Sequence, residues 1–171
     1  VEQTDAPRIF TLTINKDAVD LNEAGKEIGQ FDSLDSNHGV YLLPDGGYKM
    51  IVSNSRKKPA AAFITNADFS SIKVSLFGNK RNWVFGLNNA IMIAFAFSGA
   101  QKDLLLIHAS VTMKDGKGYL FLGKSGTGKS THSQLWLKYI PGTELLNDDN
   151  PAVRLINDEV IVYGTPWSGK T

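Results

Sequence analysis

Residues 123–130 constrain the fold of this chain more than any other segment. They read GKSGTGKS, which matches the pattern G-x-x-x-x-G-K-[ST] in full. The apolar run 119–122 precedes them and predicts a strand, and residues 129–139 predict a helix that ends at Pro141-Gly142. In that context the N–H groups of the loop and of the helix N-terminus converge on an anion. The segment therefore predicts a phosphate-binding loop rather than an ordinary glycine-rich turn.

The residue types of this loop suggest how a nucleotide would be held. Glycines let the backbone curl so that its N–H groups point inward. Lys129 is expected to reach the outer phosphates, and Ser130 to offer its hydroxyl to Mg²⁺. The residues expected to contact the nucleotide are Gly123, Ser125, Gly126, Thr127, Gly128, Lys129, Ser130 and Thr131.

Residues 164–171, GTPWSGKT, match the same pattern a second time. Here Pro166 has no N–H to donate, and Trp167 crowds a loop that would have to approach phosphate closely. We therefore interpret this segment as a turn or an active-site loop, not as a second nucleotide cradle.

Asp148 and Asp149 form the next candidate site. They follow Ser130 by one predicted helix and one turn, a length that returns the chain to the phosphates. One carboxylate would then hold Mg²⁺ while the other accepts a proton from an attacking hydroxyl. The competing interpretation is an Asx turn before Pro151, and the spacing alone leaves both open.

His108 is placed by a predicted hairpin. Asp115-Gly116 favours a two-residue turn that pairs Lys114 with Lys117, and the same register sets His108 opposite Gly123. A histidine there would orient or charge-tune a carboxylate, although a core histidine with satisfied hydrogen bonds is the plainer interpretation.

The rest of the chain suggests two regions. Short apolar runs in residues 8–78, with a turn at 44–47, predict strands and hairpins, and His38 is expected in a solvated loop. Residues 83–98 are too densely apolar for a surface helix and predict a buried one. We expect a β-rich N-terminal region over 1–82 and a phosphate-loop domain over 83–171.

The ordinary phosphate-loop fold does not fit this order of elements. That fold adds several strand–helix units after the motif, whereas only 41 residues follow Ser130 in this chain of 171. The strand that enters the loop is also hairpin-paired and hence antiparallel to its predecessor. Residues 79–82, NKRN, lack the final Asp of a guanine-specificity motif and precede the loop. A small GTPase or an ABC-type ATPase is therefore not expected.

The order of histidine, hairpin, loop and double aspartate carries a resemblance. Residues 106–110 (LIHAS), the phosphate loop and residues 146–149 (LNDD) resemble the kinase domain of bacterial HPr kinase/phosphorylase. They also resemble the nucleotide core of phosphoenolpyruvate carboxykinase, which shares that fold. The likeness covers roughly residues 104–150 and reaches toward Gly164-Thr165.

This resemblance implies an α+β fold of the phosphoenolpyruvate carboxykinase type, with a mixed or antiparallel sheet, and it implies ATP and Mg²⁺. It also implies that the acidic pair serves as metal and base residues. We lean to Asp148 as the base, assisted by His108, with Asp149 and Ser130 on the metal.

The expected activity is transfer of the γ-phosphoryl group of ATP to a hydroxyl of a protein serine or of a small molecule. Residue 131 is Thr where HPr kinases usually carry Glu, which changes the expected metal shell. Residues 8–78 do not resemble that family's N-terminal domain, and the part that docks HPr is absent, so HPr is not the expected acceptor. A phosphoenolpyruvate carboxykinase-like enzyme and a non-catalytic ATP-sensing module are the alternatives.

Composition limits the partners. Lys and Arg number 18 and Asp and Glu 17, so no strong field favours nucleic acid or an anionic membrane. The chain has no cysteine, which excludes disulfides, thiolate metal sites and a cysteine nucleophile and permits a cytoplasmic location. The most apolar run, 90–97, is shorter than the ~20 residues that cross a bilayer.

The transfer site is expected to be incomplete. The chain begins without Met and ends at Thr171, which suggests a C-terminally truncated piece of a longer protein. Phosphoryl transfer commonly uses an arginine, and Arg154 is the only one after the loop. We expect this chain to bind nucleotide but to transfer phosphoryl poorly. The missing groups would lie beyond Thr171 or on a neighbouring subunit of a homo-oligomer.

Overall fold

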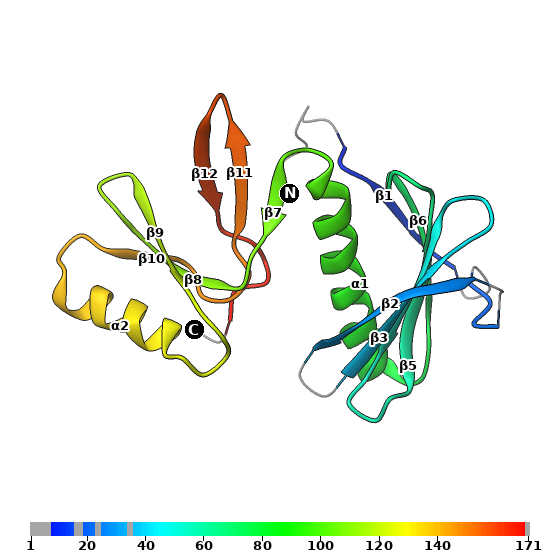
Figure 1. Cartoon of the computed structure of the whole chain (residues 1–171). Coiled ribbons are helices and arrows are strands. Elements are labelled where there is room, and N and C mark those ends of the chain that lie inside the picture. The colour runs from blue at the N-terminus through cyan, green and yellow to red at the C-terminus, as the bar shows by residue number, and fades with distance from the viewer. Residues whose placement is uncertain (1–7, 16–18, 23–24, 34–35, 170–171) are drawn as a thin grey trace. The chain divides into compact units, whose positions relative to one another are not determined.

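The computed structural model describes residues 8–15, 19–22, 25–33 and 36–169. Within them the chain forms twelve strands and two helices, an α+β arrangement made mostly of sheet, as the sequence predicts at this coarse level. The chain divides into two compact units, Val1–Gln101 and Lys102–Thr171. Figure 1 draws both units.

The first unit is a six-stranded sheet with one helix. Its strands lie in the order β1-β6-β5-β4-β3-β2, and all neighbours are antiparallel except β1 and β6. The predicted hairpin about residues 44–47 is confirmed as the β3–β4 pair. The elements are β1 (Thr11–Ile14), β2 (Lys26–Ser33), β3 (Ser36–Leu42), β4 (Tyr48–Ser53), β5 (Pro59–Thr65), β6 (Ser71–Leu76) and α1 (Lys80–Ala100).

Helix α1 packs its small residues against this sheet. Asn79 caps the helix by accepting a hydrogen bond from the Asn82 N–H. Gly86, Ala90 and Ala94 are buried, and the last two join the core around Phe63. A Cβ on Gly86 would lie 2.6 Å from the Ala60 carbonyl oxygen, so the helix approaches β5 closely only because residue 86 is glycine.

Substitution at this contact should destabilise the first unit. We expect Gly86→Val to lower its free energy of unfolding by about 1–3 kcal/mol, because the side chain would push the helix off the backbone of β5. Urea unfolding followed by circular dichroism measures the change. Val84→Ala, on the exposed side of the same helix, is the control and should change stability by less than about 0.5 kcal/mol. An unchanged midpoint for Gly86→Val would contradict this contact.

The boundary between the regions differs from the expected one. The sequence suggests a division after residue 82, but α1 contacts β4, β5 and β6 and therefore belongs to the first unit, which ends at Gln101. The apolar run 90–97 lies inside this 21-residue helix. By length and composition alone α1 could cross a membrane, and in the structure part of it is buried against the sheet.

His38 is not in a solvated loop, so that expectation is wrong. It lies in β3 with 2% of its surface exposed, and its Nδ1 accepts a hydrogen bond from the Ser53 N–H at 3.2 Å. Its ring stands edge-on to that of Phe31, the residue opposite it on β2. Pairing with β2 overrides the turn preference of the local sequence.

The second unit contains two three-stranded sheets and one helix. The sheet orders are β10-β8-β9 and β12-β11-β7, and all neighbouring strands are antiparallel. The predicted turn at Asp115-Gly116 is confirmed, since Lys114 pairs with Lys117. The elements are β7 (Leu104–Leu106), β8 (Ala109–Lys114), β9 (Lys117–Leu122), α2 (Lys129–Tyr139), β10 (Glu144–Asn147), β11 (Ala152–Ile156) and β12 (Glu159–Tyr163).

The residue types of segment 104–112 suit one continuous strand, but the structure divides the segment between the two sheets. The strand breaks at Ile107 and His108, so that β7 pairs with β11 while β8 pairs with β9 and β10. Segment 149–151 runs beside the break, where the Ile107 N–H donates to the Pro151 carbonyl and the Ala109 N–H to the Asp149 carbonyl. The break brings His108 next to the acidic pair.

The connection through α2 places the loop of residues 123–128 and the acidic pair at the same end of one sheet. Strands β9 and β10 are both antiparallel to β8 and are therefore parallel to each other. Helix α2 joins them and packs on this sheet, with Trp136 against Tyr119 and Phe121 (Figure 1). The loop follows the end of β9, and Asp148 follows the end of β10. The two segments consequently leave the sheet in the same direction.

Candidate functional site

The loop between β9 and α2 has the backbone of an anion cradle. Gly126 and Gly128 adopt φ values of 82° and 90°, in the left-handed region that favours glycine. No atom lies within 4 Å of a Cβ placed on Gly126, so this part of the loop faces open space. Thr127 closes the turn, because both its N–H and its hydroxyl donate to the Lys124 carbonyl.

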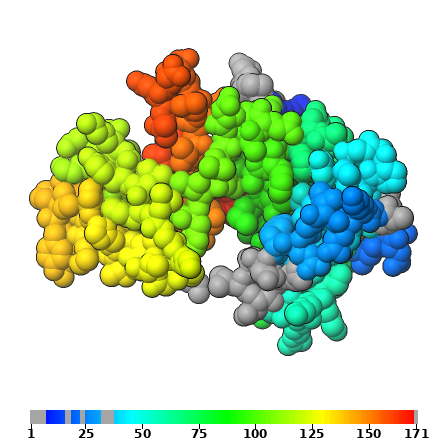
Figure 2. Space-filling view, in the orientation of Figure 1, coloured from blue at the N-terminus to red at the C-terminus, as the bar shows by residue number. Residues whose placement is uncertain are grey.

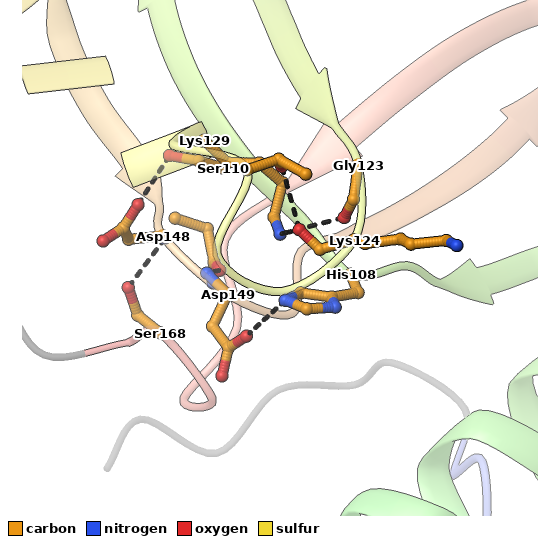
Figure 3. Close-up of polar contacts among 10 residues, drawn as sticks. His108, Ser110, Gly123, Lys124, Lys129, Asp148, Asp149 and Ser168 are labelled. Atoms are coloured by element: carbon orange, nitrogen blue, oxygen red, sulfur yellow. Dashed lines mark hydrogen bonds and ion pairs between the residues drawn. The ribbon is translucent and has the colours of Figure 1, made fainter. Parts of the chain in front are cut away.

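The first backbone N–H groups of α2 have no capping side chain and are available to a ligand. Gly128 occupies the N-cap position and provides no side-chain hydrogen bond to the first turn. The Lys129 ammonium donates to the carbonyl oxygens of Gly123 and Lys124, at 3.0 and 3.2 Å, and so lies at the loop itself (Figure 3). An uncapped helix start, a cation and glycine curvature together fit a phosphate group. Ser125, Ser130 and Thr131 are exposed in the same segment.

Asp148 and Asp149 come directly after β10, and both are half-buried. The Asp149 N–H donates to Asn147 Oδ1 at 2.9 Å, so the Asx turn considered from the sequence is present. The same turn leaves both carboxylates in the neighbourhood of the loop (Figure 3). The two interpretations of the pair are thus compatible with each other.

The Asp148 carboxylate is held by a serine that the sequence analysis does not single out as a site residue. Ser110 Oγ donates to Asp148 Oδ1 at 2.6 Å, and Ser133 Oγ on α2 lies 2.5 Å from Ser110 Oγ. Both serines are fully buried. The sequence signal that could have found Ser110 is the alternation of side chains along a strand, which places Ser110 on the face of β8 that α2 covers.

His108 lies against Asp149, not Asp148. Its Nε2 is 3.5 Å from Asp149 Oδ1, with about half of each side chain exposed (51% and 45%). The register that predicts its position is confirmed by the Ala109–Leu122 pair next to it. The interpretation of His108 as a core histidine is wrong, because the side chain is exposed and contacts a carboxylate.

The segment 164–169 runs along the acidic pair. Asn147 Nδ2 donates to the Thr165 carbonyl and hydroxyl oxygens, the Thr165 hydroxyl donates to the Asn150 carbonyl, and the Asp148 N–H donates to Ser168 Oγ. None of residues 164–169 is helical, and residues 170–171 lie outside the described part of the chain. The segment therefore lies beside the candidate site, and its interpretation as an active-site loop stays a prediction. Asn147, with 1% of its surface exposed, and Ser168 are further contributors that sequence reasoning did not identify.

The oxygen donors present suit magnesium. Mg²⁺ binds one or two carboxylates together with substrate phosphates and water, and it does not need an all-protein cage. Asp149 and Ser130 are donors of this type. In the part of the chain that the structure describes, no three or more His, Cys, Asp or Glu side chains are placed so that together they could hold a metal ion. Arg154 lies exposed in the middle of β11, paired with Leu104 and Ile161, in the sheet that does not carry the loop.

The loop and α2 lie at the surface of the second unit, where a ligand can reach them (Figure 2). Around the loop the structure gathers Lys129, His108 and the two aspartates, all of which the sequence had nominated (Figure 3). Comparison of the chain with protein-family models and with curated proteins gave no match.

Proposed function

We propose that this protein is an ATP-dependent phosphotransferase that moves the γ-phosphoryl group of ATP to a hydroxyl of a protein serine or of a small molecule. The observation that carries the proposal is the parallel placement of β9 and β10, which sets two carboxylates beside a phosphate loop. A loop without carboxylates would suit binding only, and phosphoryl transfer to a hydroxyl also needs a proton acceptor.

Each residue has a role in this proposal. The loop N–H groups and Lys129 bind the outer phosphates of ATP, and Asp149 and Ser130 would hold Mg²⁺, with His108 orienting the Asp149 carboxylate. When bound, Mg²⁺ neutralises charge on the phosphates. The acceptor oxygen forms a bond to the γ-phosphorus, the bond from that phosphorus to the β–γ bridging oxygen breaks, and ADP leaves. Asp148 takes the proton of the acceptor hydroxyl.

We also propose that the second unit has the fold shared by HPr kinase/phosphorylase and phosphoenolpyruvate carboxykinase. The antiparallel order β10-β8-β9, with the hairpin before the loop and the acidic pair after β10, supports this assignment. The exposed His108 at the break before β8 supports it as well. A carboxykinase-like activity would require further cationic and metal-ligating residues. Among the described residues, no three or more His, Cys, Asp or Glu side chains are placed so that they could hold a metal ion together.

Turnover of labelled ATP tests the proposal. The protein is incubated with ATP carrying a labelled γ-phosphate and Mg²⁺, with and without serine-containing peptides and small polyols. We expect slow labelling of one class of acceptor, because the transfer site is expected to be incomplete, and the Lys129→Ala variant should give none. Binding of ATP with no transfer to any acceptor or to water would instead identify a sensing module. The absence of ATP binding would overturn the proposal altogether.

A further inference from the structure

Two buried hydroxyls connect helix α2 to the Asp148 carboxylate. Ser110 on β8 bonds to Asp148 Oδ1 at 2.6 Å, and Ser133 on α2 bonds to Ser110 at 2.5 Å (the Ser110–Asp148 contact is drawn in Figure 3). Both serines have 0% of their surface exposed, and Ser133 is the one fully buried residue of α2. A buried hydroxyl is retained at little cost only when it is hydrogen-bonded, so this pair is a built feature of the helix–sheet contact.

The two hydrogen bonds that link Ser133, Ser110 and Asp148 run in one direction. A serine hydroxyl has a single hydrogen to donate, and an ionised carboxylate can only accept. Ser110 therefore gives its hydrogen to Asp148, and Ser133 must donate to Ser110. The two hydrogen bonds are therefore donated from the helix toward the carboxylate, and they end on one of its oxygens, Oδ1.

The second oxygen of Asp148 is left for another partner. No residue in the described part of the chain donates a hydrogen bond to Asp148 Oδ2, while the backbone N–H of Asp148 is fixed by Ser168. A carboxylate anchored at its backbone and at one oxygen has little rotational freedom. Its remaining oxygen is presented in a fixed direction, which is what in-line attack by a hydroxyl requires of a base.

We propose that Ser110 and Ser133 are positioning residues. They fix the position of the Asp148 carboxylate relative to the bound nucleotide, so that it can accept the proton of the acceptor hydroxyl. This inference rests on the proposed function. The helix that supplies Ser133 also carries Lys129 and Ser130 in its first turn. Ser133 follows Lys129 by four residues and therefore lies one turn further along the same side of α2. The element that holds the phosphates thus also sets the position of the base.

Thr112 provides a matched control for simple packing. It lies two residues after Ser110 on the same face of β8 and is also fully buried. Its hydroxyl has no hydrogen-bond partner among the residues that the structure describes. Thr112→Val removes a buried hydroxyl from the same helix–sheet contact and leaves the hydrogen bonds between Ser133, Ser110 and Asp148 unchanged.

The experiment measures three quantities for the wild type and for Ser110→Ala, Ser133→Ala and Thr112→Val. They are the affinity for a fluorescent ATP analogue, the thermal midpoint of unfolding, and the single-turnover rate of phosphate release from γ-labelled ATP with enzyme in excess. We expect Ser110→Ala to slow release by about 10–100-fold, with ATP affinity changed by less than about twofold. Ser133→Ala, which acts through Ser110, should slow it less. Thr112→Val should leave both the rate and the affinity unchanged.

Each alternative outcome has a distinct meaning. Normal rates in both serine variants would overturn the positioning role and leave the proposed function standing. A parallel loss of ATP affinity would show that Asp148 holds the nucleotide or its metal, and it would likewise overturn the role as stated. Equal slowing by Thr112→Val would identify packing as the cause. A wild-type protein that binds ATP but transfers its γ-phosphoryl group neither to water nor to any acceptor would remove the proposed function and this inference together. Ser133→Ala keeps the test open if Ser110→Ala lowers the midpoint too far, because alanine favours the helix.

Discussion

Lys129→Ala should weaken ATP binding by about 2–5 kcal/mol, the usual cost of removing one partner of a desolvated charge pair. That corresponds to a loss of affinity of roughly 30-fold to several thousand-fold. Without ligand, the Lys129 ammonium bonds to the carbonyl oxygens of Gly123 and Lys124 in an exposed loop, so the fold should survive its removal. Titration with a fluorescent ATP analogue measures the affinity, and circular dichroism checks the fold.

Lys124→Ala is the matched control for this result. Lys124 lies in the same loop and carries the same charge, but its side chain makes no ion pair among the described residues. A general electrostatic effect of the loop would weaken binding equally in the two variants. A specific phosphate contact requires a much larger loss for Lys129→Ala. Unchanged affinity in that variant would rule out the phosphate-loop assignment.

Asp148→Asn and Asp149→Asn should differ in kind. Asp148→Asn should leave Mg²⁺-ATP affinity close to normal and slow phosphoryl transfer by about 10²–10⁴-fold, because an amide cannot accept the proton. Asp149→Asn should weaken binding of ATP in the presence of Mg²⁺ but not in its absence, because the change removes a metal ligand. Titrations with and without Mg²⁺, together with single-turnover rates, separate the two effects.

Asp158→Asn controls for the loss of one negative charge from the same unit. Asp158 lies exposed in the β11–β12 turn at a φ of 65°, a conformation that asparagine tolerates, so the fold should not change. Its binding and transfer rates should match the wild type. An exchange of the two patterns between residues 148 and 149 would exchange their roles. Normal behaviour of both variants would reduce the pair to the Asx turn seen at Asn147.

Local sequence signals predicted the centre of the site. The Asp115-Gly116 turn fixed the hairpin register, and the glycines with Lys129 marked the loop, because both depend on residues adjacent in the chain. The division of residues 104–112 between two sheets was not predictable in this way. All of these residues suit a strand, and the break depends on the later segment 149–151. Pro151 accepts a bond from Ile107 but has no N–H to return, so regular pairing cannot continue through it.

The supporting serines were missed for a related reason. Ser110 and Ser133 are small polar residues of a kind that also occurs at random on surfaces, and only their meeting with Asp148 gives them a role. That meeting joins three segments far apart in the chain. His38 shows the same limit in the first unit, since its burial depends on pairing between β2 and β3 rather than on its turn-like neighbours.

The break at His108 has a mechanical consequence. The chain passes between the two sheets of the second unit before β8 and after β10, and backbone hydrogen bonds fasten these two passes to each other. After β12 the segment 164–169 returns to the same place, where it bonds to Asn147 and Asp148. Any rotation of one sheet against the other must bend the chain there, so the axis of rotation runs through the passes. The hydrogen bond from the Ala109 N–H to the Asp149 carbonyl lies on this axis, so His108 and Asp149 would keep their separation in such a rotation.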